Sequence, residues 1–144
     1  MIIYLDTSSL VKLYIDEADA DLVRGLVVEA EFVATCRIAY PEAYSAFTRR
    51  FRAGEMSAED YERVLAALMQ DWPHFVVLDF DELAAVRFVR QHALRGFDAV
   101  HLSSAFLLTQ DVGRPEVLFA CFDTRLSTAA GLEGFRVMPL PVPI

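Results

Sequence analysis

Short apolar runs alternate along the chain with longer stretches in which apolar residues recur every three or four positions. The runs predict buried strands at 2–5, 32–35, 75–78, 117–121 and 135–137. The periodic stretches predict helices at 8–14, 19–30, 41–53, 61–69, 81–94, 98–108 and 125–130. Pro41 is expected at a first helical position, and Gly54 and Gly96 are expected to end helices.

The strands are apolar throughout rather than alternating, which indicates burial on both faces. Strands that alternate with helices are typical of a parallel sheet covered by helices. We therefore predict one α/β domain over 1–144, a three-layer α/β/α sandwich with a mainly parallel central sheet. The proline-rich tail at 139–143 is expected to end the fold. In such sheets, ligands bind outside the carboxyl ends of the strands.

Composition narrows the class of protein further. A chain of 144 residues with 55% hydrophobic and 24% charged residues is not disordered. Its two cysteines, Cys36 and Cys121, cannot form a disulfide framework and are expected to be buried thiols. We find no signal peptide and no apolar run near the ~20 residues of a membrane span, so we expect a soluble, cytoplasmic protein without membrane contact.

The formal charge of −8 argues against a protein that coats nucleic acid nonspecifically, because such binding neutralises phosphates. It remains compatible with a nuclease that has a local basic rim. It also favours a cation, or a basic partner protein, that offsets the acidic groups. Arginines in the 49–52 segment, together with Arg95, are expected mainly on solvated faces, with contact to RNA phosphates as the functional alternative.

Four acidic residues stand at predicted strand ends or helix starts. Asp6 follows the first strand, Glu42 lies in a helix's first turn, and Asp98 opens a later helix. Asp123 follows the fourth strand. Helix capping explains any one of them taken singly, but the ends of parallel strands also meet at one edge of a sheet. Taken together, they form a candidate site.

Clustered carboxylates without a histidine or cysteine shell suit Mg²⁺ or Mn²⁺, which prefer oxygen ligands. Such ions polarise a phosphodiester and activate water. His101, three residues after Asp98, is interpreted as a histidine that packs in the core or hydrogen-bonds a metal-binding side chain, rather than as a metal ligand itself.

Four segments together resemble the PIN-domain nucleases, and in particular the VapC-type toxins of toxin–antitoxin pairs. They are LDTSSLVKLY at 5–14, the helical Glu42, FDAVHLSSA at 97–105 and FDTRL at 122–126. The resemblance covers the whole chain. It implies a Mg²⁺- or Mn²⁺-dependent endoribonuclease that hydrolyses RNA with a metal-activated water and leaves 5′-phosphate and 3′-hydroxyl ends.

The resemblance also implies roles for individual residues. Asp6, Glu42 and Asp98 match the core metal-binding acids, and Asp123 matches the fourth. Ser8 matches a small hydroxyl position that contacts a metal ligand or a phosphate. The chain departs from the family two residues before the fourth acid, where Cys121 stands in place of a frequent Thr or Ser.

The resemblance further implies two protein partners: a cognate antitoxin with a basic or amphipathic tail, and a second copy in a homodimer. Two alternatives to the nuclease stay open at this point. A non-catalytic PIN-like binding module would use the acids as helix caps. A haloacid-dehalogenase-like phosphatase would need an acid two residues after the first, where this chain has Ser8.

Overall fold

The computed structural model describes residues 1–139, so the predicted proline-rich tail lies outside the described residues after Pro139. Within that range, five strands form one sheet in which every pairing is parallel. They are β1 (Ile2–Leu5), β2 (Phe32–Cys36), β3 (Val76–Leu78), β4 (Val117–Ala120) and β5 (Arg136–Met138). Their order across the sheet is β3-β2-β1-β4-β5.

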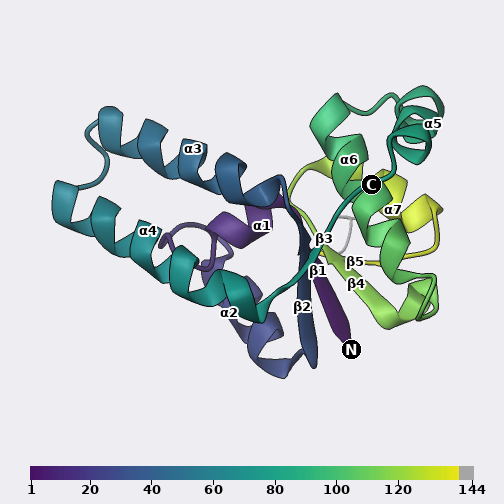
Figure 1. Cartoon of the computed structure of the whole chain (residues 1–144), viewed down its shortest axis with the longest axis horizontal. Helices are drawn as coiled ribbons and strands as arrows, with labels where there is room; N and C mark the ends of the chain where they lie inside the picture. The colour runs from purple at the N-terminus through teal and green to yellow at the C-terminus, as the bar shows by residue number, and fades with distance from the viewer. Residues whose placement is uncertain (140–144) are drawn as a thin grey trace.

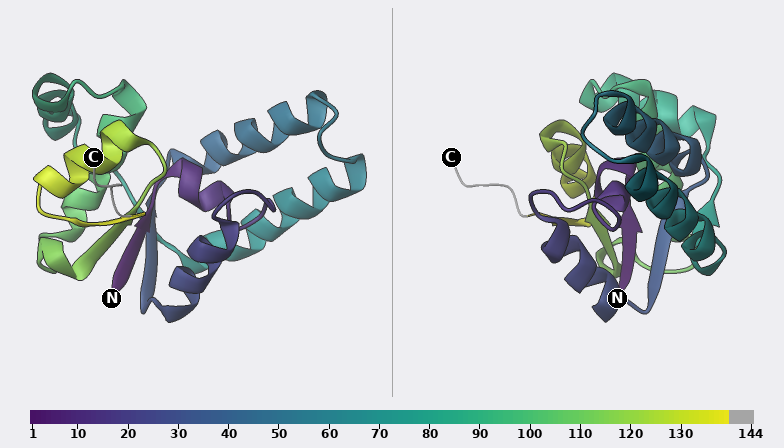
Figure 2. Two further views of the ribbon diagram at one scale, coloured as in Figure 1. Left: turned by 180° about the vertical axis from the view of Figure 1, so that it is seen from behind. Right: turned by 90° about the vertical axis from the view of Figure 1, so that its left-hand side faces the viewer.

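Helices cover both faces of the sheet, as the predicted sandwich requires (Figure 1). The α-helices are α1 (Thr7–Val11), α2 (Ala20–Glu29), α3 (Ala39–Arg52), α4 (Ala58–Asp71), α5 (Glu82–His92), α6 (Gly96–Leu108) and α7 (Thr124–Leu132). Two 3₁₀ turns, η1 (Trp72–His74) and η2 (Arg114–Glu116), precede β3 and β4. Figure 2 shows α1–α4 on one side of the sheet and α5–α7 on the other, with α3 and α4 projecting as a hairpin.

The sheet separates two apolar cores, and alternate residues of β1 supply each of them. Ile3 and Leu5 pack with the α1–α4 side, whereas Tyr4 packs with the α5–α7 side, and all three are fully buried. Burial on both faces accounts for the uninterrupted apolar character of this strand.

The structure corrects several predicted helix bounds. The helix expected over 8–14 ends at Val11, and α3 starts at Ala39, so Pro41 is its third residue rather than its first. Gly96 does not end α5. That helix ends at His92, its C-cap Ala93 adopts the left-handed conformation (φ 54°), and Gly96 instead begins α6. The chain turns early because the next residue, Leu94, is buried in the core.

The strand order reverses at β1, which has β2 on one side and β4 on the other. Such a switch point leaves a crevice outside the carboxyl ends of the two strands around it. Asp6 leaves β1 at this point, where its amide donates to the carbonyl of Ala120 at 3.3 Å. Among the helices in 1–139, none is long and apolar enough to cross a membrane.

Candidate active site

Asp6 is buried at the switch point, with 5% of its surface exposed. Its carboxylate accepts hydrogen bonds from the Ser9 amide at 3.0 Å, the Ser9 hydroxyl at 3.0 Å and the Ser8 hydroxyl at 2.8 and 3.0 Å. Burial raises the pKa of this carboxyl, and the electrostatic attraction of His101 and the hydrogen bonds offset that rise in part. The first turn of α1 therefore orients a carboxylate whose ionisation is costly without a positive partner.

Glu42, on α3, is held by side chains from two other helices. Thr7 Oγ1 donates to Glu42 Oε1 at 2.6 Å, and His101 Nε2 lies 3.1 Å from the same oxygen and 3.0 Å from Thr7 Oγ1. Partial burial opposes ionisation of Glu42, but the hydrogen bonds from His101 and Thr7 outweigh it, so its pKa lies below the ordinary value.

The same contacts assign the proton on His101. An ionised carboxylate can only accept, so Nε2 carries the hydrogen that faces Glu42. In the neutral ring Nδ1 is then bare, and the Tyr4 hydroxyl, 2.8 Å away, donates to it. Tyr4 and His101 are 0% and 3% exposed, so water does not compete for this bond. A buried chain of hydrogen bonds thus runs from β1 through α6 to the acid on α3.

Asp98 and Asp123 share one guanidinium. Arg95 Nε donates to Asp98 Oδ2 at 2.9 Å, and its Nη2 donates to Asp123 Oδ2 at 3.0 Å. The hydrogen bond to Asp98 and the charge of both carboxylates raise the pKa of Arg95. A positive group therefore already lies between these two acids.

Helix capping explains two of the four acids. Asp6 accepts from the Ser9 amide at the start of α1, and Asp123 accepts from the Leu126 amide at the start of α7. Asp98 is also predicted to open a helix, but α6 begins at Gly96, so Asp98 lies within its first turn. Its carboxylate accepts a hydrogen bond from the Arg95 side chain instead. Glu42 likewise lies inside α3 and is bonded by side chains. Capping therefore does not account for the whole set.

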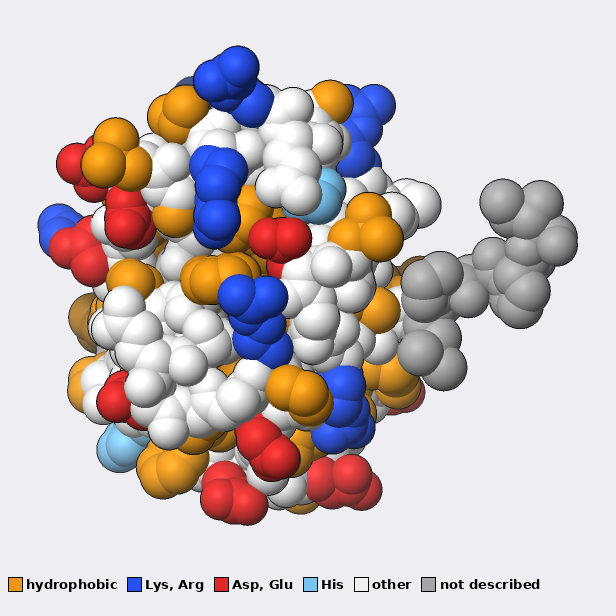
Figure 3. Space-filling view, turned by 90° about the vertical axis from the view of Figure 1, so that its right-hand side faces the viewer, with side chains coloured by type: hydrophobic (Ala, Val, Ile, Leu, Met, Phe, Trp, Pro, Cys, Tyr) orange, Lys and Arg blue, Asp and Glu red, His pale blue; other side chains and the backbone are white. Residues whose placement is uncertain are grey.

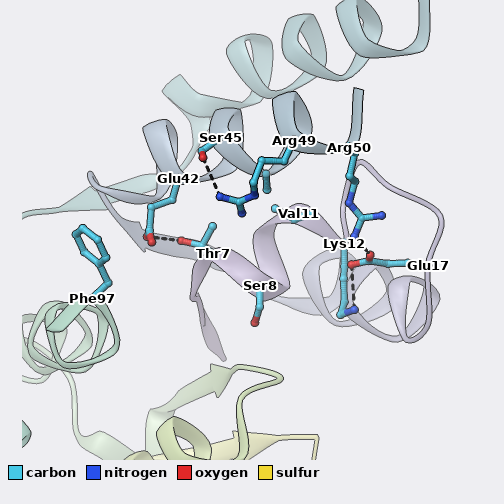
Figure 4. A pocket seen from close by; sticks show the side chains of 11 residues that line it. Thr7, Ser8, Val11, Lys12, Glu17, Glu42, Ser45, Arg49, Arg50 and Phe97 are labelled. Carbon is cyan, nitrogen blue, oxygen red and sulfur yellow. Dashed lines mark hydrogen bonds and ion pairs between the residues drawn. The ribbon is translucent and has the colours of Figure 1, made fainter. Parts of the chain in front are cut away.

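Three adjoining clefts connect Glu42, Asp98 and Asp123, whereas the buried Asp6 lines none of them. The first, of about 500 Å³, includes Glu42, Thr7 and Ser8, with basic side chains along one wall (Figure 4). The second, of about 700 Å³, has a largely apolar lining and is bordered by both Glu42 and Asp98. The third, of about 520 Å³, includes Asp98 and Asp123. Within residues 1–139, no three His, Cys, Asp or Glu side chains are grouped closely enough to hold a metal ion as they stand.

Cys121 takes over contacts that a hydroxyl would make in the loop before α7. Its sulfur accepts from the Asp123 amide and donates to the Asp123 carbonyl, both at 3.3 Å. Burial raises the pKa of the thiol, so it stays protonated. The Ser8 hydroxyl strengthens the same region by accepting from the Phe122 amide at 3.2 Å. Cys121, where the family often has Thr or Ser, therefore still holds the backbone of Asp123 in place.

Sequence reasoning missed three residues of this arrangement. Tyr4 and Thr7 carry no local signal, because both residue types also occur in ordinary cores and helix starts. Arg95 lies on a solvated face, as the sequence predicts, with 73% of its side chain exposed. Its pairing was not predicted: the spacing from Asp98 suits a pair within one turn, whereas nothing local connects it with Asp123. Figure 3 shows the face over α5–α7, where basic side chains stand apart among hydrophobic and acidic ones rather than in one continuous basic surface.

Comparison with known proteins places the chain in a family. The PIN domain model matches residues 3–132. The chain belongs to the PIN domain family. Two relatives from Mycobacterium tuberculosis are Ribonuclease VapC45 of strain CDC 1551 / Oshkosh and Ribonuclease VapC49 of strain ATCC 25618 / H37Rv. Each is 35% identical to this PIN domain over 145 residues, which cover 96% of this chain and 95% of the relative. The resemblance noted in the sequence is confirmed.

Solved structures agree on the fold. PAE2754 from Pyrobaculum aerophilum matches with a TM-score of 0.63 and 19% identity, covering 90% of this PIN domain and 79% of that chain. FitAcB from Neisseria gonorrhoeae matches with a TM-score of 0.62 and 17% identity, covering 94% and 95%. A structure of FitAB bound to an IR36 DNA fragment matches with a TM-score of 0.61 and 17% identity, covering 94% and 93%. The predicted α/β sandwich is confirmed.

Proposed function

We propose that this PIN domain is an endoribonuclease, the toxin of a toxin–antitoxin pair, which hydrolyses phosphodiester bonds in RNA. The observation that carries the proposal is that three acids, Glu42, Asp98 and Asp123, border adjoining clefts outside the carboxyl ends of the strands. The fourth, Asp6, is buried at the end of β1 and is hydrogen-bonded to Ser8, which borders the first cleft. Family membership supports it, as do the two relatives named as ribonucleases. Membership of this family also decides against the phosphatase alternative.

We further propose that Asp6, Glu42, Asp98 and Asp123 bind Mg²⁺ or Mn²⁺. The donors fit, because carboxylate oxygens suit these hard cations. The clefts also accommodate positive charge, since the Arg95 guanidinium lies between two of the acids. When bound, a divalent cation supplies an activated water and stabilises the charge on the leaving oxygen.

The protein's own residues prepare this chemistry by holding the acids in place. Thr7 and His101 orient Glu42 and keep it ionised, and Ser8 orients Asp6. Arg95 balances the charge of Asp98 and Asp123 and must release them when a divalent cation binds. No side chain is required as a covalent nucleophile in this reaction.

We also propose the partners that the family resemblance implies. A net charge of −8 favours a basic or amphipathic antitoxin tail, because opposite charge speeds and orients association. We propose a homodimer in the cytoplasm as the resting form. The antitoxin complex and the homodimer are tested by size-exclusion chromatography of the protein expressed with and without its cognate antitoxin.

The test of the function is cleavage of total cellular RNA by the purified protein freed of antitoxin, with Mg²⁺, with Mn²⁺ or with EDTA. The variants Asp6→Asn and Asp98→Asn should lose cleavage. Asp81→Asn is the matched control, since Asp81 caps α5 outside the clefts through the Leu83 and Ala84 amides. Sequencing of the fragment ends identifies the cleaved RNA and shows whether the ends are 5′-phosphate and 3′-hydroxyl.

The outcome separates the nuclease from the non-catalytic binding module. Discrete fragments that require metal, persist in Asp81→Asn and vanish in both other variants would support the nuclease. Intact RNA under every metal condition, with all variants folded, would refute it and leave the acids as caps and surface groups.

A further inference from the structure

Phe97 is an apolar ring exposed at the centre of the clefts. It is the second residue of α6, and 64% of its surface is exposed. It borders both the first and the second cleft, and Glu42 borders both as well. Its neighbour in sequence is Asp98. An aromatic side chain of this size is normally covered, so the ring offers a contact surface beside the acids.

The first cleft also contains basic groups. Lys12 and Arg50 are ion-paired with Glu17. Arg49 is exposed, donates from Nη1 to the Ser45 hydroxyl at 3.0 Å, and forms no ion pair with any residue in 1–139. Figure 4 shows Phe97 at one end of this cleft, Lys12 and Arg50 at the other, and Glu42 and Arg49 between them. The Arg49 guanidinium is thus available to an anion in the cleft.

We infer that the first cleft is a nucleotide subsite, in which Phe97 stacks on an unpaired base of RNA and Arg49 binds the adjacent phosphate. This inference rests on the proposed function, because it names the part of an RNA substrate that this cleft holds. The volume of about 500 Å³ lies within the usual range for small-ligand pockets. A base can stack on a side chain only when it is splayed out of a helix, so the subsite selects single-stranded or looped RNA.

An apolar segment of a protein would also cover the ring, but the contents of the first cleft favour RNA. The cleft combines an aromatic face, a guanidinium without an ion pair, and the hydroxyls of Thr7 and Ser8. Aromatic and basic groups side by side are the means by which proteins bind single strands. Stacking accepts any base, so the subsite sets the requirement for an unpaired base rather than its identity.

The test measures binding of a short labelled oligouridylate by fluorescence anisotropy in EDTA, with a gel to verify that the RNA stays intact. The comparison probe is the same ribose-phosphate backbone without bases. Phe97→Ala should weaken binding of the oligouridylate roughly 5- to 150-fold, the range of measured base–aromatic stacking, and leave the abasic probe unaffected. Phe97→Leu should lose binding similarly, because it keeps apolar area but no ring face.

Two further variants sharpen the test. Phe32→Ala is the matched control: Phe32 is 56% exposed but lies at the amino end of β2, away from the clefts, so its loss should leave binding unchanged. Phe97→Trp should retain binding and add a second indole to the single native tryptophan, Trp72. The oligouridylate should quench this fluorescence and the abasic probe should not.

Arg49→Gln should weaken binding of both probes equally and reduce the salt slope by about 0.7, the value for one phosphate contact to a single strand. Wild-type affinity in Phe97→Ala, or an equal loss for both probes, would overturn the stacking. A change from dimer to monomer in Phe97→Ala, seen by sedimentation, would assign the ring to a protein contact and also overturn it. Base-dependent binding through Phe97 without cleavage under any metal would refute the nuclease and leave the subsite standing.

Discussion

The hydrogen bond between Tyr4 and His101 provides a sharp test of how the site is held. Tyr4→Phe deletes one oxygen and keeps the ring, which stacks on Phe119 with centroids 5.1 Å apart. It creates no large cavity, so the change isolates the hydrogen bond. Because both partners are buried, water does not replace the lost donor, and His101 Nδ1 is left unsatisfied.

The stability that Tyr4→Phe loses follows from the burial of His101 Nδ1. An unsatisfied buried polar group costs about 1–3 kcal/mol. For a domain of this size, each kcal/mol lowers the melting temperature by roughly 2–4 °C, so Tyr4→Phe should melt about 2–12 °C below the wild type. Tyr14→Phe removes a bond of equal length, 2.8 Å to Asp71, that is exposed to solvent. Water replaces that bond, so this control should melt within about 2 °C of the wild type.

Thermal unfolding monitored by circular dichroism in EDTA measures both variants under identical conditions. The cleavage rate of Tyr4→Phe should also fall, because His101 loses the partner that holds its ring toward Glu42. Equal melting temperatures for Tyr4→Phe and Tyr14→Phe would refute the reasoning, since burial would then not decide the value of the bond.

Three other predictions test the acids and their partners. Asp123→Asn should keep the helix cap and the stability to within about 0.5 kcal/mol, because Asn caps as well as Asp, yet it should lose cleavage. The control Asp81→Asn should change neither stability nor cleavage. Full activity in Asp123→Asn would contradict the proposed site. Arg95→Gln should bind Mn²⁺ more tightly in calorimetry without RNA, because Asp98 and Asp123 lose a competing cation; unchanged or weaker binding would contradict that competition. Partial burial opposes ionisation of Glu17, but its two basic partners lower its pKa below the ordinary 4.5. The stability it contributes above that pH is lost as pH falls through the folded value, so urea midpoints from about pH 3 to 6 should fall less in Glu17→Gln than in the wild type; equal falls would contradict this role of Glu17.

The sequence was sufficient for the architecture because the apolar runs are short, unbroken and separated by periodic segments. That pattern is a property of the chain itself, so the strands and their burial could be predicted before any contact was known. Helix ends were less predictable, because they depend on tertiary contacts. The burial of Leu94 places the end of α5 at His92, with Ala93 as its cap, whereas local propensity favours an end at Gly96.

The candidate site divides in the same way. The four acids could be located because each stands near the end of a strand or the start of a helix, and their catalytic roles stay predictions. The side chains around them could not be assigned: Thr7, Glu42 and His101 lie far apart in the chain, and their meeting depends on how side chains point after packing. The same holds for the second contact of Arg95, which crosses from α6 to the loop before α7.

The central position of β1 has a consequence for synthesis on the ribosome. This strand is made well before β4, its neighbour on one side in the sheet, because the two are separated by more than half of the chain. Until β4 has emerged, one edge of β1 is unpaired and the carbonyl of Ala120 is missing beside Asp6. A nascent or truncated chain that stops before Val117 cannot bring Asp6 and Asp123 together. The third cleft, which Asp98 and Asp123 border, therefore cannot form until the chain has been made past β4.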